Sequence, residues 1–372
     1  MNSPQHNQTL SKRIPELDGL RGIAILLVLS FHYINNQLIQ SESKIGIALS
    51  KITSFGWVGV DLFFVLSGFL IGSILMRTQN SPKYFTTFFA RRFLRIIPNY
   101  YLLLFIFIIV LSIPWFKGNN FLTGNNVIPI WSYFTLTHNF YMAQLNNMGN
   151  DSMSVTWSIG IEEQFYIVFP FIVYFVKDKW LPMVLAVAII LACFLRVGHE
   201  SWIPPYVLLP CRMDAISFGA LVAWLNINKD LPALSRKYFK VLMAIILIDV
   251  LICAFLYFKY QDLGVLKNSL FAMTFAILLI FALTHKEGLY GKLLRNRMLV
   301  WVGTISYSLY LFHYLILGIF HQAIGNYGGV GINNKKDLVI SIAAFATSIL
   351  FSFSVYKLLE SPMVKWGKRL KY

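Results

Sequence analysis

Long apolar stretches with almost no charge constrain this chain more than any other feature of its sequence. Each can be extended to the roughly 20 residues that a helix needs to cross the hydrocarbon core of a bilayer. Lipid cannot satisfy the backbone groups of an open strand, so we expect a helix in each stretch. The 57% of apolar residues, the 13% of charged residues and the mean hydropathy of +0.63 are atypical of soluble domains. Clear examples are residues 101–111, 181–195, 241–258 and 338–350.

Membrane-spanning helices account for these segments, and the fold class predicted is an all-α, polytopic helical bundle. No low-complexity linker or soluble domain is evident, so residues 1–372 are expected to form one transmembrane domain. The polar segment 1–17 lacks the apolar core of a cleavable signal, which predicts a retained N-terminal segment. We expect about ten spans, at residues 18–39, 55–76, 96–115, 155–176, 180–197, 206–224, 241–258, 269–284, 299–320 and 338–359.

The distribution of Lys and Arg predicts how these spans are oriented. With the N-terminus in the cytoplasm, the segments on that side hold roughly 21 basic residues and the opposite segments roughly 7, which satisfies the positive-inside rule. Both termini are therefore predicted to be cytoplasmic, with Lys12 and Arg13 in the first segment and residues 360–372 as a tail. The formal charge of +16 then reflects topology and anionic lipid headgroups, and nucleic acid is not an expected partner.

The three cysteines fall inside the predicted spans and lack the spacing of metal ligands. They are expected to behave as small apolar residues, and neither a disulfide nor a metal site is predicted.

Ionisable residues inside a bilayer are costly, so each is a functional candidate, with a buried structural pair as the alternative. In the first span, Arg21 and His32 are eleven residues apart. That spacing returns them to nearly one helix face, about 16 Å apart along the axis. A lone His in a helix is usually a satisfied core residue. The shared face with an Arg favours function here, because a neutral imidazole can take a proton from a hydroxyl near neutral pH.

Two adjacent carboxylates, Glu162 and Glu163, lie near the start of the fourth span. The positive end of the helix dipole accounts for one of them. Neighbouring helix positions point about 100° apart, so at least one carboxylate should face the bundle interior. An interior acid near His32 would orient the imidazole and stabilise its protonated form, as in hydrolase triads.

A basic group, Arg91, Arg92 and Arg95, occupies the predicted cytoplasmic start of the third span. Arg92 and Arg95 share a helix face, with Arg91 close to Arg95 at a spacing of four. An ordinary juxtamembrane anchor and a phosphate clamp both remain open. Arg suits the clamp because its planar guanidinium binds phosphate oxygens in pairs.

The ninth span carries a polar stripe, since Ser306 and His313 lie on one helix face. Polar packing between helices would explain it equally well. Arg212 and Asp214 in the sixth span are expected to be structural partners rather than catalytic residues. Two further acids complete the intramembrane set, Asp61 in the second span, a further site candidate, and Glu360 at the end of the tenth.

Five separated motifs occur in order over most of the chain. They are Leu17-Asp-Gly-Leu-Arg-Gly-Ile-Ala24 with His32, Gly59-Val-Asp-Leu-Phe-Phe-Val-Leu-Ser-Gly-Phe-Leu70, Arg92-x-x-Arg95 with Pro98, Trp157-Ser-x-x-x-Glu-Glu-Gln-Phe-Tyr166, and Ser306-Tyr-Ser-Leu-Tyr-Leu-Phe-His313. Each alone would be weak. Together they resemble the membrane-bound acyltransferase-3 family, which O-acylates carbohydrates outside the cytoplasm and related acceptors.

The resemblance implies specific roles for the motif residues. It implies that His32 is the catalytic base, that Arg21 is essential nearby, and that Arg92 and Arg95 contribute to the binding of acyl-coenzyme A. It also implies a role for Glu162 or Glu163, with Ser308 and His313 as further candidates. No permanently bound cofactor is expected, and acetyl-coenzyme A is the expected donor.

The expected function is O-acetyl transfer to a surface polysaccharide or lipopolysaccharide sugar, by a multi-pass enzyme of the bacterial cytoplasmic membrane. Expected partners are the donor, a carbohydrate or glycolipid acceptor and membrane lipids, while homo-oligomerisation stays open. Direct transfer and a covalent acyl-enzyme both stay open as mechanisms.

Two departures from the family pattern concern the acceptor. His138 stands where relatives more often carry Gln, which leaves its role open. The chain ends soon after its last predicted span, without the esterase-like domain fused to some relatives, so acceptor recognition is expected to use the membrane domain or a partner. The alternative function is a proton-coupled transporter or lipid-carrier flippase, which also carries buried Arg, His and Glu. Paired interrupted helices in an inverted repeat would mark it, and the sequence gives no sign of them.

Overall fold

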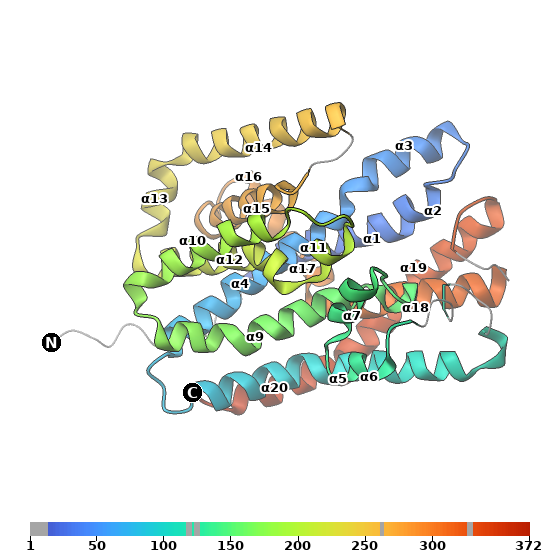
Figure 1. Ribbon diagram of the computed structural model, residues 1–372, viewed down its shortest axis with the longest axis horizontal. Coiled ribbons are helices and arrows are strands. Elements are labelled where there is room, and N and C mark those ends of the chain that lie inside the picture. The colour runs from blue at the N-terminus through green and yellow to red at the C-terminus, as the bar shows by residue number, and fades with distance from the viewer. Residues whose placement is uncertain (1–13, 117–120, 123–126, 261–263, 326–329) are drawn as a thin grey trace.

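The computed structural model describes residues 14–116, 121–122, 127–260, 264–325 and 330–372. Within these ranges the regular structure is entirely helical, and ten helical stretches are long and apolar enough to cross a membrane. Figure 1 shows the long helices packed beside one another along the longest axis of the molecule. The prediction of an all-α, multi-pass membrane bundle is confirmed. Lys12 and Arg13, counted above as cytoplasmic, lie outside the described residues.

Several spans combine more than one helix. The first five are α1 (Pro15–Ser30) continued by a π-helical turn (Phe31–Asn35) and α2 (Asn36–Leu38); α3 (Lys44–Thr53) leading into α4 (Gly59–Thr78); α5 (Tyr84–Ser112); α8 (Asp151–Ser154) leading into α9 (Trp157–Phe175); and α10 (Leu181–Leu195). Two short helices, α6 (Ile130–Phe134) and α7 (His138–Leu145), lie between the third and fourth spans.

The second half of the chain follows the same plan. Its spans are α11 (Ile203–Val207) with α12 (Leu209–Asn228), α14 (Phe239–Tyr260), α15 (Lys267–Thr284), α18 (Ser306–Phe320) with a π-helical turn (His321–Gly325), and α19 (Lys335–Val355) with a π-helical turn (Tyr356–Glu360) and α20 (Ser361–Arg369). Short connecting helices are α13 (Leu231–Lys237), α16 (Leu289–Leu294) and α17 (Arg297–Thr304).

The ninth span corrects one predicted boundary. A single helix was expected over residues 299–320, but α17 ends at Thr304 and α18 begins at Ser306. Ile305 between them has φ −95° and ψ 4°, outside the helical region. The apolar run crosses this break because α17 packs against α1 at Gly303, where a Cβ would meet the carbonyl of Asp18. Hydropathy registers apolar residues on both sides of the break, and it carries no information on where one helix ends and the next begins.

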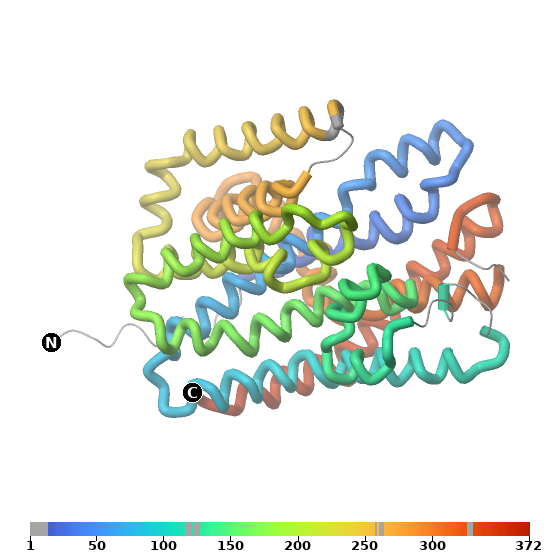
Figure 2. Tube along the Cα trace, in the orientation of Figure 1, coloured from blue at the N-terminus to red at the C-terminus, as the bar shows by residue number. Residues whose placement is uncertain are grey.

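Segments predicted to be cytoplasmic meet at one end of the bundle. Glu16, in the first turn of α1, lies 3.7 Å from Arg295, which precedes α17. Near the start of α5, the Thr87 hydroxyl donates to the carbonyl of Lys371 at 2.9 Å, and Figure 2 shows α20 running alongside α5. These contacts bring the start of α1 and the C-terminal tail to predicted cytoplasmic segments. Which membrane side they occupy stays a prediction from charge.

Small residues hold α4 and α12 together. A Cβ at Gly68 would meet the carbonyl oxygen of Ile216, and a Cβ at Gly219 would meet that of Val65. In lipid, the hydrophobic effect does not draw helices together, so close van der Waals packing between small residues supplies much of the association. This close approach also brings acidic and basic side chains of the two helices within bonding distance, as described below.

Replacing Gly219 by Ala is expected to destabilise the fold by about 1–3 kcal/mol, because the added methyl group can only be accommodated by moving α12 away from α4. The matched control is Gly367→Ala in α20, where the nearest atom to a new Cβ is 3.7 Å away. Thermal unfolding of both variants in detergent measures the difference. Equal melting temperatures would show that the helix contact yields without cost.

Candidate active site

His32 lies on the π-helical turn that interrupts the first span. Such turns place an extra residue in the helix and occur frequently at functional sites. The His32 ring packs against the ring of Tyr314, with centroids 4.3 Å apart, and against that of His313, with centroids 5.0 Å apart. It lines a cavity of about 450 Å³, which we call the histidine cavity.

His313 of α18 fixes the proton arrangement of His32. Its Nδ1 lies 2.7 Å from the carbonyl oxygen of Tyr310 and 3.0 Å from that of Leu309. A carbonyl oxygen only accepts, so Nδ1 of a neutral His313 carries the proton and Nε2 is an acceptor. Nε2 lies 3.0 Å from Nδ1 of His32, which must then be the donor. The lone pair of His32 is consequently on Nε2, where it is able to accept a proton from a ligand.

This arrangement corrects the expected partner of His32. The sequence pointed to an interior acid as the group that orients the imidazole, but the structure puts His313 in that place. Glu162 instead faces a different cavity, where its carboxylate interacts electrostatically with Arg95, Arg92 and Arg21.

The second cavity, of about 100 Å³, is lined by Arg21, Arg92, Arg95 and Glu162, and we call it the arginine cavity. Arg21 also forms an ion pair with Asp18, with 3.3 Å between nitrogen and oxygen. Within the described residues, Nε of Arg92 is buried without a hydrogen-bond partner. Three guanidinium groups face one lining carboxylate, which makes this cavity suited to an anion.

Arg91 does not line the arginine cavity. Its Nε and Nη2 donate to the carbonyl oxygen of Leu370 at 3.1 and 2.5 Å, and its guanidinium lies 4.6 Å from the ring centroid of Tyr372. Adjacent helix positions point about 100° apart, so Arg91 and Arg92 face different surroundings. The predicted group of three arginines thus divides into two that line the cavity and one that binds the C-terminal tail.

Ser308 belongs to a buried polar cluster with Asn99 and Glu360. Its hydroxyl donates to Oε2 of Glu360 at 2.6 Å, and Nδ2 of Asn99 lies 3.1 Å from Ser308 Oγ and 3.2 Å from that carboxylate oxygen. Sequence reasoning missed Asn99. The available signal was its spacing of four from Arg95, which continues the polar face of α5.

The arginine and histidine cavities meet at two residues that line both, Val60 and Tyr310. The Tyr310 hydroxyl donates to the carbonyl oxygen of Val155 at 2.9 Å and contacts Ser158 Oγ at 2.8 Å. Ser158 lines the arginine cavity and Val155 lines the histidine cavity. These hydrogen bonds hold the Tyr310 ring in the partition between the two spaces.

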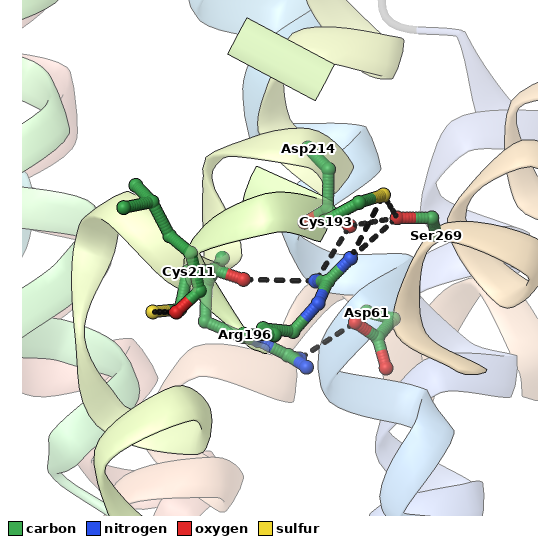
Figure 3. A network of polar contacts seen from close by, with 8 residues as sticks. Asp61, Cys193, Arg196, Cys211, Asp214 and Ser269 are labelled. Atoms are coloured by element: carbon green, nitrogen blue, oxygen red, sulfur yellow. Dashed lines mark hydrogen bonds and ion pairs between the residues drawn. The ribbon is translucent and has the colours of Figure 1, made fainter. Parts of the chain in front are cut away.

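Arg212 and Asp214, expected as structural partners, do not pair with each other. Nη2 of Arg212 donates to Oδ1 of Asp61 at 2.6 Å, and Nη1 of Arg196 donates to Oδ2 of Asp214 at 2.8 Å. Figure 3 shows the contact between Arg196 and Asp214, with the Ser269 hydroxyl bridging these two residues. Residues two apart on a helix point about 200° apart, so each must find its partner on another element. Asp61 therefore holds Arg212 and lines neither cavity.

His138 is packed in the segment between the third and fourth spans. Its Nε2 lies 3.1 Å from Thr156 Oγ1, and its ring stacks on that of Tyr133 with centroids 4.7 Å apart. Burial lowers the pKa of His138 to about 4, so the ring is neutral at physiological pH. It connects this segment to the start of α9 and is absent from the described linings of both cavities.

Comparison with known proteins places this geometry in context. The acyltransferase domain family matches residues 14–357. The O-acetyltransferase OatA of Staphylococcus aureus is 27% identical over 380 residues, which cover 95% of this chain and 58% of that protein. The peptidoglycan O-acetyltransferase OatA of Listeria monocytogenes is 28% identical over 378 residues, which cover 96% of this chain and 56% of that protein. The chain thus spans a little over half the length of these relatives. No solved structure matches it.

Asp61→Ala is expected to destabilise the protein by about 3–5 kcal/mol, because it leaves the buried guanidinium of Arg212 without its counter-charge. Both side chains are fully buried, at 0% exposure. The double variant Asp61→Leu with Arg212→Met should recover most of that loss, since it removes both charges and retains volume. Thermal unfolding in detergent measures the series. A single variant as stable as the unmodified protein would contradict this structural role for Asp61.

Proposed function

The chain belongs to the acyltransferase domain family, and from this we propose that it is a membrane O-acetyltransferase. It would move an acetyl group from cytoplasmic acetyl-coenzyme A to a hydroxyl of a carbohydrate outside the cytoplasm. The observation that carries this proposal is the meeting of two cavities at Val60 and Tyr310, one lined by arginines and the other holding His32. We place the protein in the bacterial cytoplasmic membrane.

The arginine cavity is the proposed donor site. Coenzyme A carries phosphate groups, and guanidinium groups bind phosphate oxygens in pairs. Arg21 lies in the second turn of α1, and Arg92 and Arg95 lie in the first half of α5, so all three are near the predicted cytoplasmic end. The pantetheine arm then extends toward Tyr310, which brings the thioester to the partition between the cavities.

The histidine cavity is the proposed acceptor site. A sugar hydroxyl in this cavity gives its proton to Nε2 of His32 while its oxygen attacks the thioester carbonyl. The carbon–oxygen bond forms, the carbon–sulfur bond breaks, and the departing thiolate takes the proton back from His32. His313 accepts the hydrogen bond from Nδ1 of His32 throughout, so it positions the base without contacting either substrate.

The acceptor is proposed to be a cell-envelope glycan. Peptidoglycan, which the name of the Listeria relative gives as the substrate of that protein, is the first class to test. The aromatic and polar lining of the histidine cavity supports a carbohydrate, because pockets of this kind combine apolar faces with a few placed polar groups.

Removing the base should abolish transfer without loss of the fold. His32→Ala is expected to lower kcat by about 10²–10⁴-fold, the contribution typical of a general base, with little change in the KM for donor. His313→Leu is expected to lower kcat strongly. His313→Gln is expected to retain more activity, because the side-chain oxygen of Gln can accept the hydrogen bond from Nδ1 of His32. Acetyl transfer by membranes matched for protein content measures all three.

Two outcomes would contradict this assignment. Near-normal turnover by His32→Ala would remove His32 from its role as base. Equal loss in the Leu and Gln variants of His313, at unchanged expression, would show that the hydrogen bond to His32 is not what His313 contributes.

The donor site can be tested by exchanging Arg for Lys, which keeps the charge and removes the forked donor group. Replacing both Arg92 and Arg95 is expected to raise the KM for acetyl-coenzyme A roughly tenfold or more, because each lost charge-assisted contact costs about 1.5–3 kcal/mol. Arg91→Lys is the matched control, since Arg91 binds the C-terminal tail. A donor titration in which the double variant keeps a normal KM, or in which the control raises it equally, would argue for a membrane anchor.

A further inference from the structure

A third cavity adjoins the histidine cavity at the end of the bundle opposite the predicted cytoplasmic segments. It has a volume of about 300 Å³, and we call it the outer cavity. Three residues, Trp202, Tyr206 and Lys267, line both this cavity and the histidine cavity. The two spaces are therefore neighbours with a common wall, and a ligand longer than one unit is able to extend from one to the other.

A row of aromatic rings follows that wall. The rings of Trp157 and Tyr206 have centroids 4.4 Å apart, and those of Tyr206 and Trp202 have centroids 5.5 Å apart. Trp157 is buried and lines only the histidine cavity, whereas Trp202 is 60% exposed. The row therefore leads from the interior, beside the proposed base, to the outer surface.

Buried ion pairs hold this row of aromatic rings in place. The guanidinium carbon of Arg212 lies 5.2 Å from the ring centroid of Tyr206 and 5.7 Å from that of Trp157, and Asp61 fixes the same guanidinium. At the end of α10, Arg196 is fixed by Asp214, as Figure 3 shows. Binding surfaces are more precise when packing and hydrogen bonds lock their residues, and these contacts supply that support.

The segment that carries Trp202 is also fixed at its outer side. The hydroxyl of Ser201 donates to the side-chain oxygen of Asn146, which follows α7. Ser201 lines the outer cavity, so this hydrogen bond ties part of the cavity lining to the segment that follows α7.

The polar residues of the outer cavity suit hydroxyl groups. Its lining combines the rings of Trp202 and Tyr206 with basic, acidic and amide side chains. These polar side chains are Arg196, His199, Glu200, Lys267 and Asn268. Aromatic faces accept the apolar face of a sugar ring, while the donors and acceptors between them satisfy its hydroxyls. An exposed Trp near a membrane interface can also serve as a lipid anchor. Trp202 differs from a simple anchor because it lines two cavities among charged residues.

We propose that the outer cavity is a subsite for the sugar next to the one that is acetylated. The acceptor then spans at least two sugar units, which lie over Tyr206 and Trp202, and the reacting unit occupies the histidine cavity. This subsite rests on the proposed acetyl transfer. The histidine cavity, of about 450 Å³, and the outer cavity, of about 300 Å³, each lie within the range of about 300–1,000 Å³ that binds a small ligand by itself, so a single sugar would leave one of the two empty.

The test compares acceptors of different length with Trp202 variants of the full chain in membranes. The acceptors are N-acetylglucosamine and the disaccharide and tetrasaccharide fragments of peptidoglycan glycan strands, with labelled acetyl-coenzyme A as donor. For Trp202→Ala, the loss of kcat/KM with the tetrasaccharide is expected to be about tenfold larger than the loss with the monosaccharide. Trp202→Phe should retain most of the activity because it keeps a ring face. The KM for donor should be unchanged in both variants.

Trp180→Ala is the matched control, because Trp180 is a half-exposed tryptophan at the opposite end of α10. This variant is expected to have the same kcat/KM as the unmodified protein with every acceptor. Equal losses on short and long acceptors for Trp202→Ala would indicate a structural or anchoring role, and no loss on any acceptor would remove Trp202 from binding. Either result would overturn the subsite while leaving acetyl transfer intact. If the unmodified protein acetylates none of the acceptors, the proposed function on which the subsite rests would instead be overturned.

Discussion

The fully buried ion pair between Arg212 and Asp61 is the contact on which the rest of this structure depends. Taking two charges out of water is costly, and the pair persists because each ion has its partner and because Arg212 also lies against aromatic rings. The close packing of α4 and α12 at Gly68 and Gly219 is what allows the two side chains to meet. Asp61 directly follows Val60, so the same contact positions one residue of the partition between the two cavities.

Helix periodicity explains which parts of the site could be predicted from sequence. Arg21 and His32 were expected on one stripe of the first span, and the structure places them in the linings of two different cavities. The same rule, applied to Arg212 and Asp214, shows that residues two apart cannot face each other. The separation of Arg91 from Arg92 also follows from periodicity. Which of the two faces the cavity depends on the packing of α5 against other helices, and no local pattern carries that information.

Contacts between distant segments explain what the sequence did not predict. His32 and His313 are 281 residues apart in the chain, and their hydrogen bond exists only because α18 packs against the first span. The hydropathy pattern predicted ten spans well because burial in lipid is a property of local composition. It did not predict the break at Ile305, since α17 remains apolar while it turns to pack against α1.

The choice of His313 as partner of His32 has an electrostatic consequence. A carboxylate in this position would add a buried charge, which is expensive where water is excluded. A neutral imidazole, held by backbone carbonyl oxygens, fixes the same tautomer without that charge. A positive charge then forms on His32 only when a substrate proton arrives, and it is lost again when the thiolate leaves. In the proposed reaction the neutral His313 adds no negative charge that would hold the proton on His32, which favours proton return to the thiolate.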